Sequence, residues 1–246
     1  MPVNESSMDA RNLEKLVAPL LRAAAAEARV WLRPLLTNPE SYRAFSALDN
    51  ELFIRAESFD GPLLIASSTR GEGRTVVALL LSVLECAVDP SRRILLVDGD
   101  VNHGRLGNLL GLAADAQGLS EFAEGKTRLE DCIHATALPN LFLVPAARSG
   151  HRTAYLSPKG FESFIDLIRD QYDLTVIDSP AGGQSKHILS MARSVRNVLL
   201  VVKYGGPTRE QLVELVTELR RARAEVLGCI LNQREFVVPN LFYGHR

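Results

Sequence analysis

Short continuous apolar runs alternate with longer amphipathic segments over most of the chain. Each apolar run is typical of a strand buried on both faces, and each amphipathic segment of a surface helix. The runs predict strands near 63–67, 93–98, 141–144, 173–178, 197–203 and 226–232, and the segments predict helices near 75–88, 160–170, 185–194 and 208–224. Strands that alternate with helices form a parallel sheet covered on both faces. We therefore predict an α/β fold with a doubly wound, mainly parallel sheet.

The region before the first strand has helical spacing instead. Between 13 and 36 apolar residues recur every three or four positions, and Pro19 interrupts the pattern. Proline begins a helix more comfortably than it sits inside one, so we expect two short helices or one kinked helix. A further helix is expected from Pro39 to about Ala56.

We interpret residues 1–57 as a helical N-terminal extension, followed by one large domain over 58–235 and a tail over 236–246. Arg22, Arg29 and Arg33 form no dense basic face in the extension. The extension is therefore expected to pack on the domain or to dock a partner, rather than to lie on a membrane.

Composition excludes several classes of protein. The chain has 246 residues, a net charge of −1, and three scattered cysteines, Cys86, Cys132 and Cys229. The charge gives no basic field for nucleic acid, and the cysteines and histidines have no spacing typical of a disulfide framework or a zinc site. No run approaches the ~20 apolar residues of a membrane span, and the N-terminus lacks a secretory pattern. We expect a cytoplasmic protein that reaches a membrane through a partner.

A glycine-containing loop lies between the first predicted strand and the next helix. Its sequence is Ser67-Ser68-Thr69-Arg70-Gly71-Glu72-Gly73-Arg74-Thr75. Glycines let backbone N–H groups surround a phosphate, the helix N-terminus adds partial positive charge, and Thr75 offers a hydroxyl to magnesium. Arg74 stands where such loops carry a lysine, and its planar head has a different donor geometry. The loop predicts a site that still binds phosphate but is weakened in catalysis.

Two more predicted strands end in carboxylates. Asp98 and Asp100 follow the second strand, and Asp178 ends the strand over 173–178. Because ligands bind at the carboxyl ends of parallel strands, we expect these loops and the glycine loop to meet in one crevice. A single strand-terminal aspartate is commonly a helix cap or a turn residue. Three strand ends that carry phosphate-binding or metal-binding residues together indicate a site for a nucleotide and magnesium.

These motifs resemble those of the bacterial tyrosine kinases (BY-kinases) of capsular and exopolysaccharide synthesis, within the P-loop ATPases that include Min- and Par-type positioning proteins. The resemblance runs from about Glu40 to Asn232, which is most of the chain. It rests on the loop over 67–75, on Leu95 to Asp100 (Asp-x-Asp), on Tyr172 to Pro180 (Walker B), on Gly228 to Asn232 (Gly-x-x-x-Asn), and on Glu40 to Phe45, which resembles the ring-assembly helix of these kinases.

The resemblance implies a P-loop ATPase-like domain over 58–235 that binds ATP or ADP with Mg²⁺. The implied nucleotide contacts are Ser68, Thr69, Arg70, Gly71, Glu72, Gly73, Arg74, Thr75 and Asn232, the last near the base. Magnesium would be held by Thr75, Asp100 and Asp178, and catalysis would depend on Asp98, Asp100 and Arg74. Glu40 and Arg43 would join copies in a homo-oligomer. The implied partner is a membrane-embedded polysaccharide chain-length or export protein, which would hold the chain at the inner membrane.

The chain departs from the family pattern at several motifs. Besides Arg74, the replacements are Arg70 for the loop proline, Asn102 for the basic residue after Asp-x-Asp, Ala181 for the second proline after Walker B, and Ser46 for the second arginine of the assembly motif. The kinases also carry a C-terminal tyrosine cluster, whereas this tail offers only Tyr243. We therefore expect a nucleotide-binding regulatory subunit in exopolysaccharide or capsule synthesis and export, with weakened catalysis.

Three other functions stay open. An active protein-tyrosine kinase requires Arg74 to substitute adequately for lysine. A Min/Par-like positioning ATPase is disfavoured by Thr69, where that class has a signature lysine, and by the Pro239-containing tail, which lacks an amphipathic helix. The third is a scaffold that docks its partner without binding nucleotide.

Overall fold

The computed structural model describes residues 10–24, 26–38, 61–113, 115–146, 156–181 and 186–233. Several predicted features lie outside these residues. They are the helix from Pro39 to Ala56 with the assembly residues Glu40 and Arg43, and the tail with Tyr243.

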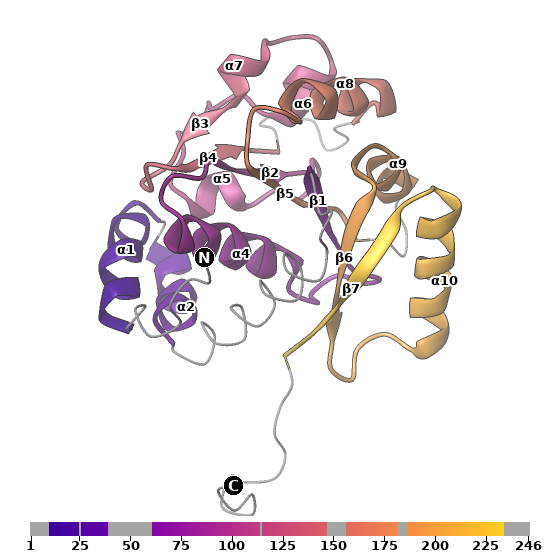
Figure 1. Cartoon of the computed structure of the whole chain (residues 1–246), viewed down its shortest axis with the longest axis horizontal. Coiled ribbons are helices and arrows are strands. Elements are labelled where there is room, and N and C mark those ends of the chain that lie inside the picture. Colours follow the sequence, from indigo (N-terminus) through magenta and orange to yellow (C-terminus); the bar gives the residue numbers. More distant parts are fainter. Residues whose placement is uncertain are drawn as a thin grey trace, which may run out of the picture.

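A seven-stranded sheet forms the centre of the described structure (Figure 1). Its strands are β1 (Pro62–Ala66), β2 (Ile94–Asp98), β3 (His134–Ala135), β4 (Leu141–Val144), β5 (Leu174–Asp178), β6 (Asn197–Lys203) and β7 (Glu225–Asn232), in the order β3-β4-β2-β5-β1-β6-β7. Neighbours are parallel except β3, which pairs antiparallel with β4. This order places the carboxyl ends of β1, β5 and β2 side by side.

Helices cover both faces of the sheet, as Figure 1 shows. One apolar core lies between the sheet and helices α1 (Ala10–Ala23), α2 (Ala26–Thr37), α4 (Arg74–Val88) and α5 (Leu106–Leu109). The other core lies on the opposite face, under helices α6 (Leu119–Ala123), α7 (Leu129–Cys132), α8 (Pro158–Ile168), α9 (Lys186–Val195) and α10 (Arg209–Arg221). Strands buried on both faces need continuous apolar runs, which is the pattern the sequence has. The predicted doubly wound fold is confirmed.

The N-terminal helices share a core with α4. Val17 and Leu20 of α1, and Leu32 and Leu36 of α2, are buried in the same apolar cluster as the inner face of α4. Of the two arrangements expected here, the structure has the two short helices, and Pro19 lies inside the first of them. An interior proline loses a backbone hydrogen bond, and burial of the flanking Val17 and Leu20 offsets that loss.

Leu20→Ala is expected to lower the free energy of unfolding by about 2–5 kcal/mol, because it leaves a cavity between α1 and the domain. Val30→Ala on α2 is the control, since Val30 is 77% exposed and its truncation should change stability by no more than about 0.5 kcal/mol. Chemical denaturation of both variants measures the difference. Equal stability of the two would show that α1 does not pack on the domain.

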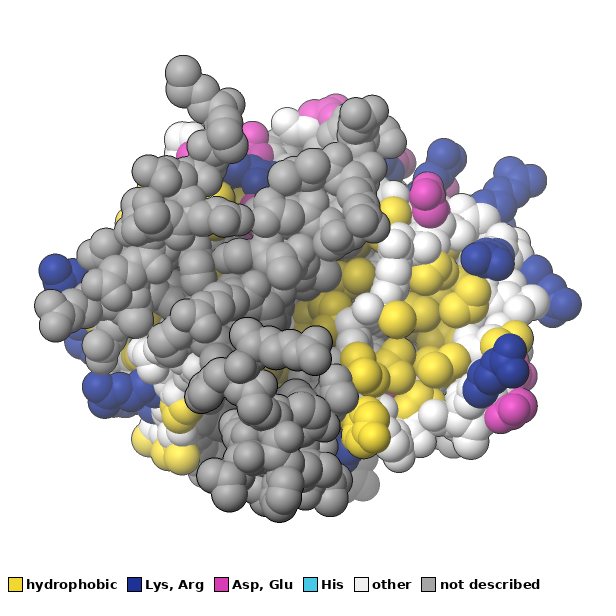
Figure 2. Space-filling view, turned by 60° about the horizontal axis from the view of Figure 1, so that its bottom comes forward, with side chains coloured by type: hydrophobic (Ala, Val, Ile, Leu, Met, Phe, Trp, Pro, Cys, Tyr) yellow, Lys and Arg dark blue, Asp and Glu magenta, His cyan; other side chains and the backbone are white. Residues whose placement is uncertain are grey.

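The edge strand β7 is only partly buried. Its register with β6 shifts between Val198 and Leu199, where the pairing passes over Leu227 of β7. Leu231 of β7 is 54% exposed and Val213 of α10 is 56% exposed. Figure 2 shows apolar side chains gathered on this side of the molecule. The last residue of this strand, Asn232, nevertheless reaches the candidate site.

Candidate functional site

The glycine loop, Asp98 and Asp178 meet at the carboxyl end of the sheet. Asp98 lies opposite Asp178 in the β2–β5 register. Thr75 donates a hydrogen bond from Oγ1 to Asp178 Oδ2 over 2.6 Å, and Arg74 Nε lies 4.0 Å from Asp178 Oδ1. The structure thus brings together residues from the three strand ends that the sequence singled out.

Three charged side chains at this point are buried. Arg74 is 9% exposed, Asp178 3% and Asp98 1%. Burial raises the pKa of both aspartates above the ordinary range, and the neighbouring Asp178 adds to the rise at Asp98. Burial also lowers the pKa of Arg74, an effect that the Asp178 charge opposes. Burial therefore favours the uncharged form of each of these groups.

Three buried atoms of these side chains lack a hydrogen-bond partner among the described residues. Arg74 Nη1, Asp98 Oδ1 and Asp178 Oδ1 make no hydrogen bond with any described residue. A buried charged atom without a partner is costly, and native structures usually explain it by a ligand, ion or water. A guanidinium nitrogen beside two carboxylate oxygens fits a phosphate together with a cation.

The loop before α4 has the backbone that a phosphate cradle requires. Gly71 and Gly73 adopt the left-handed conformation, with φ of +80° and +95°. Helix α4 begins at Arg74, directly after Gly73, and no side chain caps its first N–H groups. These free N–H groups and the positive end of the helix are available to an anion.

Glu72 holds the first half of the loop in shape. Its buried carboxylate accepts hydrogen bonds from Ser68 Oγ at 2.9 Å, Thr69 Oγ1 at 2.8 Å and the backbone N–H of Lys203 at 3.1 Å. The sequence assigned Ser68, Thr69 and Glu72 to nucleotide contacts. In the structure these side chains bind one another, so their contact with a nucleotide stays a prediction.

Two side chains at the end of β7 fasten the second half of the loop. Asn232 donates from Nδ2 to the carbonyl of Glu72 at 2.9 Å, and Gln233 donates from Nε2 to the carbonyl of Gly71 at 3.2 Å. Asn232, predicted to lie near the base, is therefore in contact with the loop backbone. Gln233 was not predicted, because no sequence pattern relates it to a loop that precedes it by more than 150 residues.

Asp100 contacts the loop after β2, and its charge also acts on the buried Asp178 and Arg74. Its Oδ1 accepts from the backbone N–H of His103 at 3.2 Å and lies 3.3 Å from His103 Nδ1. The exposed Arg70 of the glycine loop reaches the same imidazole, with Nη2 3.1 Å from Nε2. Arg70 thus contacts the loop after β2, and sequence reasoning missed His103 because 33 residues separate it from Arg70.

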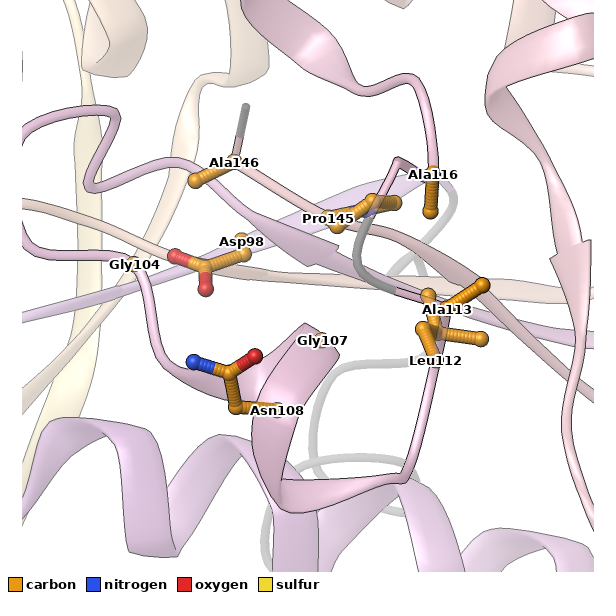
Figure 3. Close-up of a pocket in the computed structure, with 9 residues that line it drawn as sticks. All are labelled: Asp98, Gly104, Gly107, Asn108, Leu112, Ala113, Ala116, Pro145 and Ala146. Atoms are coloured by element: carbon orange, nitrogen blue, oxygen red, sulfur yellow. The ribbon is translucent and has the colours of Figure 1, made fainter. Parts of the chain in front are cut away.

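A pocket of about 80 Å³ adjoins Asp98 (Figure 3). Besides Asp98 and Asn108 its walls are mostly small residues, among them Gly104, Gly107 and Ala146. A Cβ on Gly104 would lie 2.2 Å from the Ala146 Cβ, so this glycine permits the close approach of the two loops. The volume suits two or three waters, at ~30 Å³ each, or a small polar group beside the carboxylate.

Within the described residues no group of three or more His, Cys, Asp or Glu side chains could hold a metal ion by itself. Magnesium is commonly bound by one or two carboxylates together with water and substrate phosphates. Thr75 and Asp178 are the residues best placed to hold it in that way.

The parallel strand order and the glycine loop define a P-loop ATPase-like fold. No protein-family profile matches the chain. Its sequence is 26% identical over 174 residues to tyrosine-protein kinase CpsD of Streptococcus agalactiae, covering 70% of this chain and 73% of that protein. It is 25% identical over 181 residues to tyrosine-protein kinase etk of Escherichia coli, covering 73% of this chain and 24% of that one.

Solved structures agree with this class. The kinase domain of Escherichia coli tyrosine kinase ETK superimposes with a TM-score of 0.72, over 84% of this chain and 82% of that one, at 23% identity. The septum site-determining protein MinD of Pyrococcus horikoshii, complexed with Mg-ADP, gives a TM-score of 0.61 over 70% of each chain at 28% identity. The chain is a distant homologue of the bacterial tyrosine kinases within the P-loop ATPase superfamily.

Proposed function

We propose that the chain binds ATP or ADP with Mg²⁺ and acts as a regulatory subunit related to the tyrosine kinases of capsule and exopolysaccharide synthesis, with weakened catalysis. The observation that carries the proposal is a set of three buried atoms without a hydrogen-bond partner among the described residues, where β2, β5 and the start of α4 meet: Arg74 Nη1, Asp98 Oδ1 and Asp178 Oδ1. The Mg-ADP complex of the MinD neighbour supports a nucleotide as the ligand.

Each group at the site has a role in this proposal. Arg74 and the first N–H groups of α4 would hold phosphate oxygens. Thr75 and Asp178 would hold magnesium, which neutralises phosphate charge when bound. Asp98 would orient a polar group at the pocket beside it. Asp100, whose charge acts on Arg74 and Asp178, would add to the negative charge around the metal.

Titration calorimetry with ATP and with ADP, each with and without Mg²⁺, tests nucleotide binding. We expect heat of binding that depends on Mg²⁺, and thermal stabilisation of about 2.7 kcal/mol when the nucleotide is at 100 times its Kd. The absence of both at millimolar nucleotide would support the scaffold function instead.

Weakened catalysis is proposed from the replacements at Arg74, Arg70 and Asn102 and from the single tail tyrosine, Tyr243. Protein purified from cells should give negligible signal in anti-phosphotyrosine blots, and Tyr243→Phe should leave that background unchanged. One observation favours the alternative, an active kinase: the buried Asp98 lines a pocket with room for a polar group. A strong signal that Tyr243→Phe removes would establish that alternative.

The proposed partner is a membrane-embedded polysaccharide chain-length or export protein. The chain spans about a quarter of the full length of EpsB from Ralstonia nicotianae and of etk. Among the described helices none is both long enough and apolar enough to cross a membrane. A homo-oligomer through Glu40 and Arg43 stays a prediction, as those residues lie outside the described structure.

A further inference from the structure

Five exposed arginines stand at the end of the sheet opposite the candidate nucleotide site. They are Arg193 in the last turn of α9, Arg196 just after it, Arg220 and Arg221 in the last turn of α10, and Arg223 just after it. These helices lead into the starts of β6 and β7, which pair there (Figure 1). The whole chain has a net charge of −1, so a group of five arginines differs in sign from the chain as a whole.

The pairing of the first residues of β6 and β7 brings the two helix ends together. The N–H of Glu225 donates to the carbonyl of Arg196 over 2.7 Å. Arg169, at the end of α8, donates to the carbonyl of Ser194 in α9 over 3.4 Å and adds a sixth guanidinium to the same end of the molecule. The ends of α8 and α9 and the start of β7 therefore lie together at this end of the sheet.

None of these charges is neutralised by an ion pair within the described part of the chain. No ion pair joins any of the five to an acidic side chain in the described part of the chain, although Glu218 and Glu225 lie close in sequence. Elsewhere on the surface, Arg128 pairs with Asp131. The five guanidinium groups are thus available to an external anion.

Two of the five occupy backbone positions that disfavour arginine. Arg196 and Arg223 have φ of +74° and +65°. Arg223 follows α10 in a Schellman arrangement, in which its N–H bonds the Arg220 carbonyl and the Ala224 N–H bonds the Leu219 carbonyl. Glycine is the usual residue there, and a side chain costs roughly 1 kcal/mol. The helix dipole explains cations in the last turns, but it does not explain arginine at these two positions.

We propose that this surface, the arginine face (Arg193, Arg196, Arg220, Arg221 and Arg223), binds directly to an anionic phospholipid membrane. Guanidinium groups bind phosphate oxygens in bidentate pairs. Exposed side chains spread over the ends of two neighbouring helices suit an extended array of headgroups better than one enclosed anion. Such contact would turn the opposite, nucleotide-binding end of the sheet toward the solution.

Sedimentation of the full chain with vesicles tests the proposal. The protein should sediment with vesicles of phosphatidylglycerol and phosphatidylcholine but not with phosphatidylcholine alone, and added salt should weaken the binding. Arg196→Gly with Arg223→Gly should weaken it about tenfold or more, since each basic residue near a membrane contributes on the order of 1 kcal/mol. Glycine suits both backbone positions, so the melting temperature of this variant should stay level or rise.

The matched control is Arg22→Gln with Arg209→Gln, which removes two charges from exposed positions on α1 and at the opposite end of α10. This variant should bind vesicles as the unaltered protein does. If both double variants lose vesicle binding equally, the binding depends on net charge alone, and the proposal is overturned. Failure of the unaltered protein to sediment with anionic vesicles would also overturn it, and binding to polyglutamate in that case would identify an acidic protein segment as the partner instead.

Discussion

Replacing Arg74 with alanine is expected to weaken ATP and ADP binding by about 1.5–3 kcal/mol, the range for a hydrogen bond to a charged group. That range corresponds to a loss in affinity of roughly 10- to 150-fold. Arg74 is the buried cation at the start of α4, and its Nη1 has no partner among the described residues. Calorimetric titration measures the effect. Arg128→Ala, which removes an exposed arginine paired with Asp131, is the control and should bind nucleotide normally.

Arg74→Lys separates binding from catalysis at the same position. Lysine keeps the positive charge and restores the residue that phosphate loops of this type carry, so nucleotide binding should be retained. We expect ATP turnover to stay at background, because Asn102 and Ala181 depart from the other two motifs as well. A large gain in phosphate release would instead show that Arg74 alone accounts for the weak catalysis. It would contradict the proposal that changes in the other motifs also weaken catalysis.

Gly73→Val is expected to abolish nucleotide binding. A side chain at this position would fill the space that a phosphate needs, as the sequence predicts, and the structure adds two reasons. Gly73 has φ of +95°, which disfavours a β-branched residue, and a Cβ there would lie 2.1 Å from Asn232 Nδ2. The valine would therefore force the loop away from β7 and displace the start of α4.

Thermal shift with saturating Mg-ATP measures the loss at Gly73. Gly125→Ala controls for backbone strain alone, since Gly125 has φ of +70° and a Cβ there would meet nothing within 4 Å. This control should lower the melting temperature modestly and keep the nucleotide-dependent shift. Binding that survives in Gly73→Val would show that the loop is not the phosphate site.

The sequence predicted the long elements well, because strands buried on both faces and amphipathic helices have distinct apolar periods. Helices α5, α6 and α7 have four or five residues each, and β3 has two, too few to display a period. The sequence could not decide between two short helices and one kinked helix, because the cost of Pro19 is local, whereas the burial that offsets it depends on α4.

The convergence of Asp98, Asp178 and the glycine loop could be anticipated from the rule that parallel strands present their carboxyl ends together. The contacts that shape the glycine loop could not be anticipated from the sequence. The Arg70–His103 contact depends on how the loop after β2 turns, and the Gln233–Gly71 bond depends on the order of strands in the sheet. Neither leaves a spacing or composition signal in the sequence.

The partly exposed edge strand β7 has a consequence for hydrogen exchange. An edge strand with few buried residues opens locally at lower free energy than the centre of a sheet. Opening of β7 would break the bonds from Asn232 and Gln233 to the glycine loop, so the loop and the strand end should lose order together. A nucleotide that orders the loop would therefore slow amide exchange in β7 and at the start of α4 in parallel.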